Sequence, residues 1–451
     1  MQSTSNQAMV SPVITTKQRA TSTAPKYIPY HLGNFKQIPA VRQYLSPQQI
    51  VDIEVVGRVF PFRLNNYVAE QLIDWRKAAD DPIFNLTIPV RGMLNEAHYE
   101  RIAGLLRAGA SEQEIKQAAD AIRLELDPHP AGQLQHNRPC LNGELLEGVQ
   151  HKYRETVLFF PSPGQTCHAY CTYCFRWAQF VGMHGLKIAM KEADRLWQYL
   201  QTQPQVTDVL FTGGDPMTMR ATVLRRYVEP LLRSELGHVQ NIRIGTKSLS
   251  YWPYRFVNDA DSDEVLQLFR KVVQSGKHLA VMAHFTHPHE MNTPTVARAI
   301  ENIRATGAEI RTQSPIVANI NDDAEVWARM WREQVRLGMI PYYMFIARNT
   351  GAQHHFAVPL ERAWRIFKRA YRQVSGLARS VRGPVMSCHP GKVQVLGVKK
   401  VGDEKVFVLR ALQARQPERV HQPFFARYDP EAVWFDQLSP ADEESAAFFQ
   451  Q

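Results

Sequence analysis

Short apolar runs alternate with amphipathic stretches between about residues 154 and 350, and this alternation restricts the fold more than any other feature. The apolar runs cover residues 156–160, 207–212, 241–246, 278–285, 309–313 and 339–346. Helix-like stretches lie between them at residues 190–202, 221–234, 263–275, 293–307 and 323–338. Such alternation predicts βα units and a parallel sheet. Six units suit an α/β fold built as a partial (β/α)6 barrel, with its chemistry at the carboxyl ends of the strands.

The N-terminal third of the chain has a different composition. Residues 1–51 contain no Asp or Glu and are rich in Ser, Thr and Gln. We expect a disordered or loosely docked tail there, with a transit peptide as the alternative. Residues 52–150 are predicted to be a helical region and linker, with helices over residues 68–80, 95–108 and 111–124.

The remaining boundaries follow from the same patterns. Residues 151–392 are predicted to form the barrel, and residues 393–451 a short C-terminal extension. Within that extension, residues 393–400 and 405–412 flank Gly402 and Asp403, which predicts a β-hairpin.

Charge and hydropathy exclude several classes of protein. The net charge is +10, but the basic residues occur as scattered short pairs, so we expect no nucleic-acid partner. No run of eighteen apolar residues occurs, and no apolar signal region is present, so we expect no membrane association and a cytoplasmic location. Three of the five cysteines lie within eight residues, which favours a metal site over a disulfide framework.

The cysteine motif is the strongest chemical signal in the chain. Cys167, Cys171 and Cys174 have the spacing C-x3-C-x2-C and directly follow a predicted strand. Thiolates are the ligands that iron–sulfur clusters prefer, and three of them leave one iron of a [4Fe–4S] cube open to a small molecule. A zinc site is the alternative, but zinc normally needs four ligands, and His168 is poorly spaced to complete the set.

This motif resembles that of the radical S-adenosylmethionine enzymes. The resemblance implies that S-adenosylmethionine chelates the open iron and yields a 5′-deoxyadenosyl radical. It implies that Tyr173 packs near the adenine, and that Gly213, Gly214 and Asp215 bind the methionine end. Gln313, in the segment Thr-Gln-Ser, is a further candidate contact with S-adenosylmethionine.

A narrower resemblance covers roughly residues 126–396. The segments FTGGDP, RIG, HFTHPHE, TQS, PYY and PGK occur in that order, as in the lysine 2,3-aminomutase family. The resemblance implies that pyridoxal 5′-phosphate binds Lys392 as a Schiff base and that Lys152 and Arg154 contact its phosphate. Arg176 matches the arginine that holds the substrate carboxylate. The implied reaction is a 1,2-amino shift that converts an L-α-amino acid into a β-amino acid.

Two departures from the family concern the substrate and the assembly. Lysine-specific members hold the distal ammonium with two aspartates, where this chain has Arg348 and Val385. A positive charge repels an ammonium, so an acidic substrate such as glutamate suits Arg348 better; the alternative is that Arg348 points to solvent. No cysteine follows Cys388, so the resemblance does not extend to the family's C-terminal zinc segment.

Further expectations concern partners and competing functions. We expect a small amino-acid substrate, an electron donor such as flavodoxin or ferredoxin, and a homo-oligomer. A radical enzyme of another reaction type, for instance one acting on a protein-bound lysine, is the first alternative function. A non-catalytic iron–sulfur or zinc module is the second.

Overall fold

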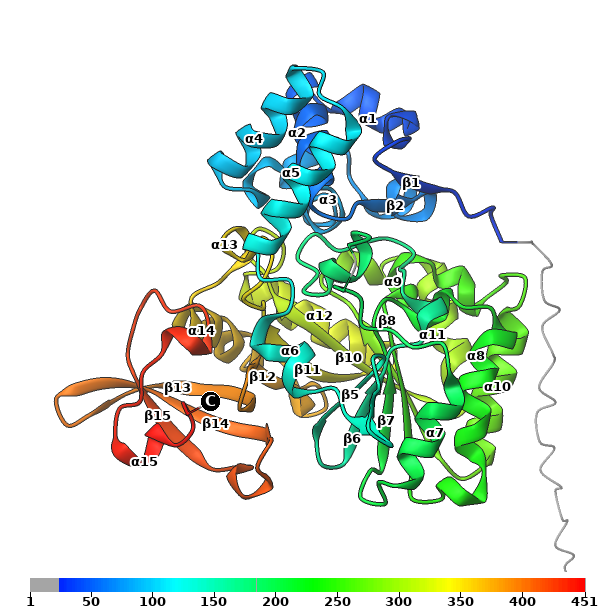
Figure 1. Ribbon diagram of the computed structural model, residues 1–451, viewed down its shortest axis with the longest axis vertical. Helices are drawn as coiled ribbons and strands as arrows, with labels where there is room; N and C mark the ends of the chain where they lie inside the picture. Colours follow the sequence, from blue (N-terminus) through cyan, green and yellow to red (C-terminus); the bar gives the residue numbers. More distant parts are fainter. Residues whose placement is uncertain (1–23, 184, 451) are drawn as a thin grey trace, which may run out of the picture.

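The central feature of the structure is one large mixed sheet (Figure 1). The computed structural model describes residues 24–183 and 185–450. Within these residues the sheet has eleven strands, β5 to β15, and their order in the sheet is their order in the chain. The strands are β5 (Val149–Tyr153), β6 (Thr156–Phe159), β7 (Asp208–Phe211), β8 (Asn241–Thr246), β9 (His278–His284), β10 (Glu309–Ile316), β11 (Ile340–Ile346), β12 (Arg382–Ser387), β13 (Gly391–Val401), β14 (Glu404–Ala414) and β15 (Pro423–Arg427).

Strands β6 to β12 are parallel, and helices connect them. The connecting helices are α7 (Ala193–Gln201), α8 (Ala221–Val228), α10 (Ser262–Gln274), α11 (Pro294–Arg304), α12 (Ala324–Arg336) and α14 (Leu360–Tyr371). Helix α12 shows why they form: Asp323 caps its first turn, and Trp327, Trp331 and Gln334 bury one face of the helix. The predicted α/β class is therefore confirmed. Each predicted run contains a strand, and each predicted stretch contains a helix.

The N-terminal region packs around a second apolar cluster, to which Trp177, Trp252 and Phe356 of the main unit also contribute. It contains β1 (Pro29–His31), α1 (Pro39–Tyr44), α2 (Pro47–Val59), β2 (Arg63–Asn65), α3 (Pro82–Thr87), α4 (Glu96–Arg107) and α5 (Glu112–Glu125). Figure 1 shows these helices stacked at one end of the sheet. The helices predicted over residues 95–108 and 111–124 are confirmed, and Ser111 and Glu114 form the expected capping box.

Two predictions for this region are wrong. Residues 24–51 are not a loose tail, because Phe35, Ile38 and Val41 are buried and anchor α1; residues 1–23 lie outside the described part of the chain. Residues 68–80 are not one helix. They form a short π-helix (Val68–Leu72) and a 3-10 turn (Ala78–Asp80), separated by extended backbone at Ile73. That break allows Trp75 to be buried, with its indole N–H donating to the carbonyl oxygen of Ala69 at 2.7 Å.

The C-terminal segment belongs to the main sheet. Strands β13 and β14 form the predicted hairpin, with Gly402 in the left-handed conformation (φ 60°) at its turn. The boundary predicted after Lys392 falls inside β13, so residues 393–451 continue the sheet as well as its apolar core. Among the described residues, no helix has the length and apolarity needed to cross a lipid bilayer.

Candidate active site

The loop that carries the three cysteines follows β6 and is held by the N-terminal region. The backbone N–H of Tyr170 donates to the carbonyl oxygen of Arg63, and that of Thr172 donates to the carbonyl oxygen of Leu86, both at 2.9 Å. The Thr172 hydroxyl donates to the carbonyl oxygen of Asn85 at 2.6 Å. Parallel strands end at the same edge of a sheet, so this loop and the loops after β7 to β12 surround one site.

The three thiols lie close enough to influence one another. Each is half-buried, and burial raises the pKa of each, that of Cys174 to about 12. The neighbouring cysteines raise the pKa of Cys167 further, as does Asp215. Among the described residues, no three His, Cys, Asp or Glu side chains converge as tightly as a single metal ion requires. Thiolates that bind separate irons of a cube need no such convergence, so this donor set fits a cluster.

The glycine-rich turn after β7 packs directly against the cysteine loop. The backbone N–H of Asp215 donates to the carbonyl oxygen of Thr166 at 2.7 Å. A Cβ atom at Gly214 would lie 2.4 Å from the backbone nitrogen of Thr166, so a larger residue would displace the chain next to Cys167. The close approach explains this glycine in structural terms, independently of any ligand.

The Asp215 carboxylate joins this turn to the loop after β8. It is buried and accepts hydrogen bonds from the Thr246 hydroxyl at 2.7 Å, the Lys247 backbone N–H at 2.8 Å and the Ser248 hydroxyl at 2.9 Å. Burial raises its pKa, and these donors oppose the rise. Its side chain is thus committed to protein donors, and the contacts of Asp215 and both glycines with S-adenosylmethionine stay predictions.

Tyr173 and Gln313 lie on neighbouring parts of the same edge. The Tyr173 hydroxyl forms a hydrogen bond with Thr286 at 2.7 Å, and its ring centroid is 6.3 Å from that of His284. Gln313 on β10 stands opposite His284 on β9 and Tyr343 on β11. Both residues therefore lie near His284, and their role toward S-adenosylmethionine stays a prediction.

Lys392 lies on β13 among aromatic and basic side chains. Its Nζ donates to the side-chain oxygen of Gln413 at 2.6 Å and lies 5.3 Å and 5.1 Å from the ring centroids of Tyr153 and Tyr343. Burial lowers its pKa to about 7, and nearby arginines and Lys152 add to the effect. A Cβ atom at Gly391 would lie 2.0 Å from the carbonyl oxygen of Gln413, so glycine is needed beside this lysine.

The two residues predicted to contact the cofactor phosphate, Lys152 and Arg154, have different surroundings in the structure. Lys152 on β5 donates to the carbonyl oxygen of Cys388, and burial lowers its pKa to about 7. Arg154, in contrast, is exposed at the turn after β5. Arg415 is a basic residue that does influence Lys152: its Nε donates to the carbonyl oxygen of His389 at 3.1 Å, and its charge contributes to the lowered pKa of Lys152. Arg415 directly follows β14, far from Lys152 in the sequence, and no local sequence pattern indicates that the two residues interact.

Arg176 and Arg348 lie against the same aromatic ring. Their guanidinium carbons are 4.9 Å and 5.3 Å from the centroid of Phe175. Burial lowers the pKa of each to about 10. Nη1 of Arg176 and Nε of Arg348 are buried without a hydrogen-bond partner, and neither side chain forms an ion pair within residues 24–183 and 185–450. Arg348 therefore does not extend into solvent, and two unpaired donors face the same region.

A loop of three cysteines at the carboxyl edge of a parallel sheet, together with a buried lysine whose pKa is lowered to about 7, is the arrangement of a cofactor-dependent enzyme. A protein of Aquifex aeolicus (strain VF5), provisionally named L-lysine 2,3-aminomutase, is 31% identical over 385 residues, which cover 85% of this chain and 89% of that protein. The L-lysine 2,3-aminomutases of Acetoanaerobium sticklandii and Bacillus subtilis (strain 168) are each 27% identical; the matches cover 57% and 51% of this chain and 58% and 46% of those proteins.

The chain belongs to the lysine 2,3-aminomutase family. It is an enzyme, a radical S-adenosylmethionine isomerase of the aminomutase class, and the cofactors of the family are a [4Fe–4S] cluster, S-adenosylmethionine and pyridoxal phosphate. No family model matches the chain. The solved structure of Streptococcus suis SuiB bound to its precursor peptide SuiA is 11% identical and covers 64% of this chain and 61% of SuiB, with a TM-score of 0.33, too low to support an argument.

Proposed function

We propose that this enzyme is a pyridoxal-phosphate-dependent 2,3-aminomutase whose substrate is an L-α-amino acid with an acidic side chain, such as glutamate. The observation that carries the proposal is the pair of guanidinium groups on Phe175. One carboxylate would pair with Arg176 and the other with Arg348, which would satisfy the two buried N–H groups that lack partners. Charge-assisted pairs of this kind are stronger than neutral hydrogen bonds.

The donor groups around this pair fit the family's cofactors. Cys167, Cys171 and Cys174 would hold the cluster, Lys392 would hold pyridoxal phosphate, and Lys152 would pair with the phosphate. When bound, the cluster and S-adenosylmethionine supply a hydrogen-abstracting radical, and pyridoxal phosphate carries the migrating amino group. The protein's own part is to orient the substrate through the two arginines and to keep water away with Tyr153, Phe175 and Tyr343.

The remaining expectations fit this function as proposals. The parallel strands β6 to β12 would curve as the partial (β/α)6 barrel that the alternation predicts. One electron from a donor such as flavodoxin or ferredoxin would reduce the cluster and start the reaction, because the amino shift itself involves no net oxidation or reduction. The enzyme would act in the cytoplasm as a homo-oligomer.

The direct test is a product assay on the anaerobically reconstituted full-length enzyme with S-adenosylmethionine and dithionite. We expect ¹³C-labelled L-glutamate to give β-glutamate, detected by NMR, and L-lysine to give at most a trace of its β-isomer. Turnover of L-lysine in preference to glutamate would overturn the acidic-substrate proposal. Cleavage of S-adenosylmethionine without turnover of any amino acid would favour a protein-bound lysine as substrate.

Replacing Arg348 with methionine should weaken glutamate binding while leaving the fold intact. A charge-assisted hydrogen bond contributes about 1.5 to 3 kcal/mol, so kcat/KM for glutamate should fall roughly 10- to 100-fold, mainly through KM. Arg372→Met is the matched control, because Arg372 is exposed at the C-terminal end of α14, and it should behave as wild type. An unchanged KM in Arg348→Met would place the second carboxylate elsewhere.

The lowered pKa of Lys392 predicts a pH dependence for cofactor attachment. Lys392 is protonated below about pH 7 and neutral above it, and only the neutral amine attacks the aldehyde of pyridoxal phosphate. The rate of adduct formation in the cofactor-free protein, followed by absorbance, should rise between pH 6 and 8 (about one unit on either side of that pKa) and then level off. A rate that still climbs toward pH 10 would indicate an ordinary surface lysine instead.

A further inference from the structure

A buried ion pair between Lys247 and Glu290 lies near the cysteine loop and is not part of the proposed substrate site. Nζ of Lys247, after β8, lies 2.5 Å from a carboxylate oxygen of Glu290, after β9. Lys247 is 7% exposed and Glu290 is fully buried. Charges are placed in such surroundings only when they are fully paired, and removing one partner is costly.

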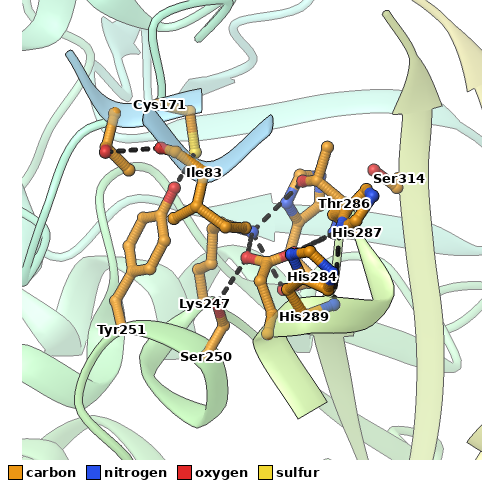
Figure 2. Close-up of polar contacts among 12 residues, drawn as sticks. Ile83, Cys171, Lys247, Ser250, Tyr251, His284, Thr286, His287, His289 and Ser314 are labelled. Atoms are coloured by element: carbon orange, nitrogen blue, oxygen red, sulfur yellow. Dashed lines mark hydrogen bonds and ion pairs between the residues drawn. The ribbon is translucent and has the colours of Figure 1, made fainter. Parts of the chain in front are cut away.

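Hydrogen bonds fix both members of the pair. Lys247 also donates to the Thr286 hydroxyl at 3.2 Å and to the carbonyl oxygen of His284 at 3.3 Å, which uses all three of its N–H groups. Glu290 accepts from the backbone N–H groups of Thr286 and His287 and from the Ser250 hydroxyl. Figure 2 shows Lys247 among Ser250, Thr286 and His284. The position of this charge is therefore fixed by the fold.

Tyr251 connects the pair to one cysteine. It is buried at the end of α9 (Ser248–Tyr251), and Nζ of Lys247 lies 4.7 Å from its ring centroid. Its hydroxyl lies 3.2 Å from Sγ of Cys171. Figure 2 shows these two side chains next to each other. The carbonyl oxygen of Tyr251 accepts from the side chain of Asn65 at 2.9 Å, so its backbone is also anchored to the N-terminal region.

These contacts have a direct consequence for a cysteine that binds iron. A thiolate on iron has no proton, so Tyr251 must be the donor in its bond with Cys171. Reducing a [4Fe–4S] cluster adds one electron, and the added negative charge spreads onto the sulfur ligands. A hydrogen-bond donor and a fixed positive charge beside one sulfur both favour the reduced form. Glu290 forms an ion pair with Lys247 and offsets part of its field.

We propose that Tyr251, held by the Lys247–Glu290 pair, is a positioning residue that raises the reduction potential of the cluster through Cys171. The inference rests on the proposed cluster site at Cys167, Cys171 and Cys174. Its role is to make the first electron transfer easier, with dithionite or the natural donor as the reductant and the cluster as the acceptor of one electron.

The test is a redox titration of reconstituted full-length Tyr251→Phe, monitored by the EPR signal of the reduced cluster in the absence of substrate. At the wild-type midpoint, the ratio of reduced to oxidised cluster should fall about tenfold, which is about 59 mV for one electron. Tyr254→Phe is the matched control, because Tyr254 packs on Trp252 and Tyr67 instead, and its midpoint should not move.

Iron analysis distinguishes the ways in which the inference can fail. An intact cluster with an unshifted midpoint in Tyr251→Phe overturns it, because the contact then has no electronic effect. Loss of the cluster in Tyr251→Phe alone also overturns it, because Tyr251 then only holds the loop. A wild-type protein without about four irons per chain would instead refute the cluster site itself.

Discussion

Lys392→Met should lose amino migration by on the order of 10⁴-fold or more, as expected when a covalently acting side chain is removed. The variant should fold at least as well as wild type, because methionine fills similar space and a buried amine with a pKa lowered to about 7 is costly to desolvate. The measurements are the absorbance of bound pyridoxal phosphate and peptide mapping after borohydride reduction.

Lys152→Met is the control for this prediction, because burial also lowers the pKa of Lys152 to about 7. It should keep the adduct on Lys392 and bind the cofactor more weakly, since it removes only a phosphate contact. An adduct that maps to Lys152 in the Lys392→Met protein, together with retained turnover, would show that Lys152 and not Lys392 is the attachment residue.

Cys174→Ser should lower the iron content of the reconstituted protein and abolish reductive cleavage of S-adenosylmethionine. A serine oxygen is a harder ligand than a thiolate and binds cluster iron poorly, so two thiolates would have to hold the cube. Cys140→Ser is the control, because Cys140 is exposed and lies outside the loop, and it should retain full iron. Full iron and full cleavage in Cys174→Ser would exclude Cys174 as a ligand.

The order of strands and helices could be predicted because each parallel strand is buried and each helix has one apolar face. The unit made of α14 and β12 is not visible in the sequence pattern, because β12 carries Gly383 and Pro384 and lacks a continuous apolar run. The N-terminal segment was misjudged because composition alone hides anchors such as Phe35. A few apolar side chains are enough to order an otherwise polar segment when they can pack against a neighbouring apolar surface.

The site residues show where local sequence stops being informative. The three cysteines lie within one loop and the two glycines within another, so each group is visible in the local sequence. Arg415 and Glu290 reach the site through pairing between distant segments, which no local pattern reveals. Arg154 illustrates the reverse: it is only two residues from Lys152, but β5 ends at Tyr153 and Arg154 lies exposed in the turn that follows.

The strict agreement between strand order and chain order affects how the protein is made. Each new strand can add to a neighbour that has already left the ribosome, so no early strand has to wait for a distant partner. The cysteine loop and its N-terminal support emerge long before Lys392 on β13. The proposed cluster site is therefore synthesised first, and the proposed pyridoxal phosphate site is completed only when the C-terminal hairpin joins the sheet.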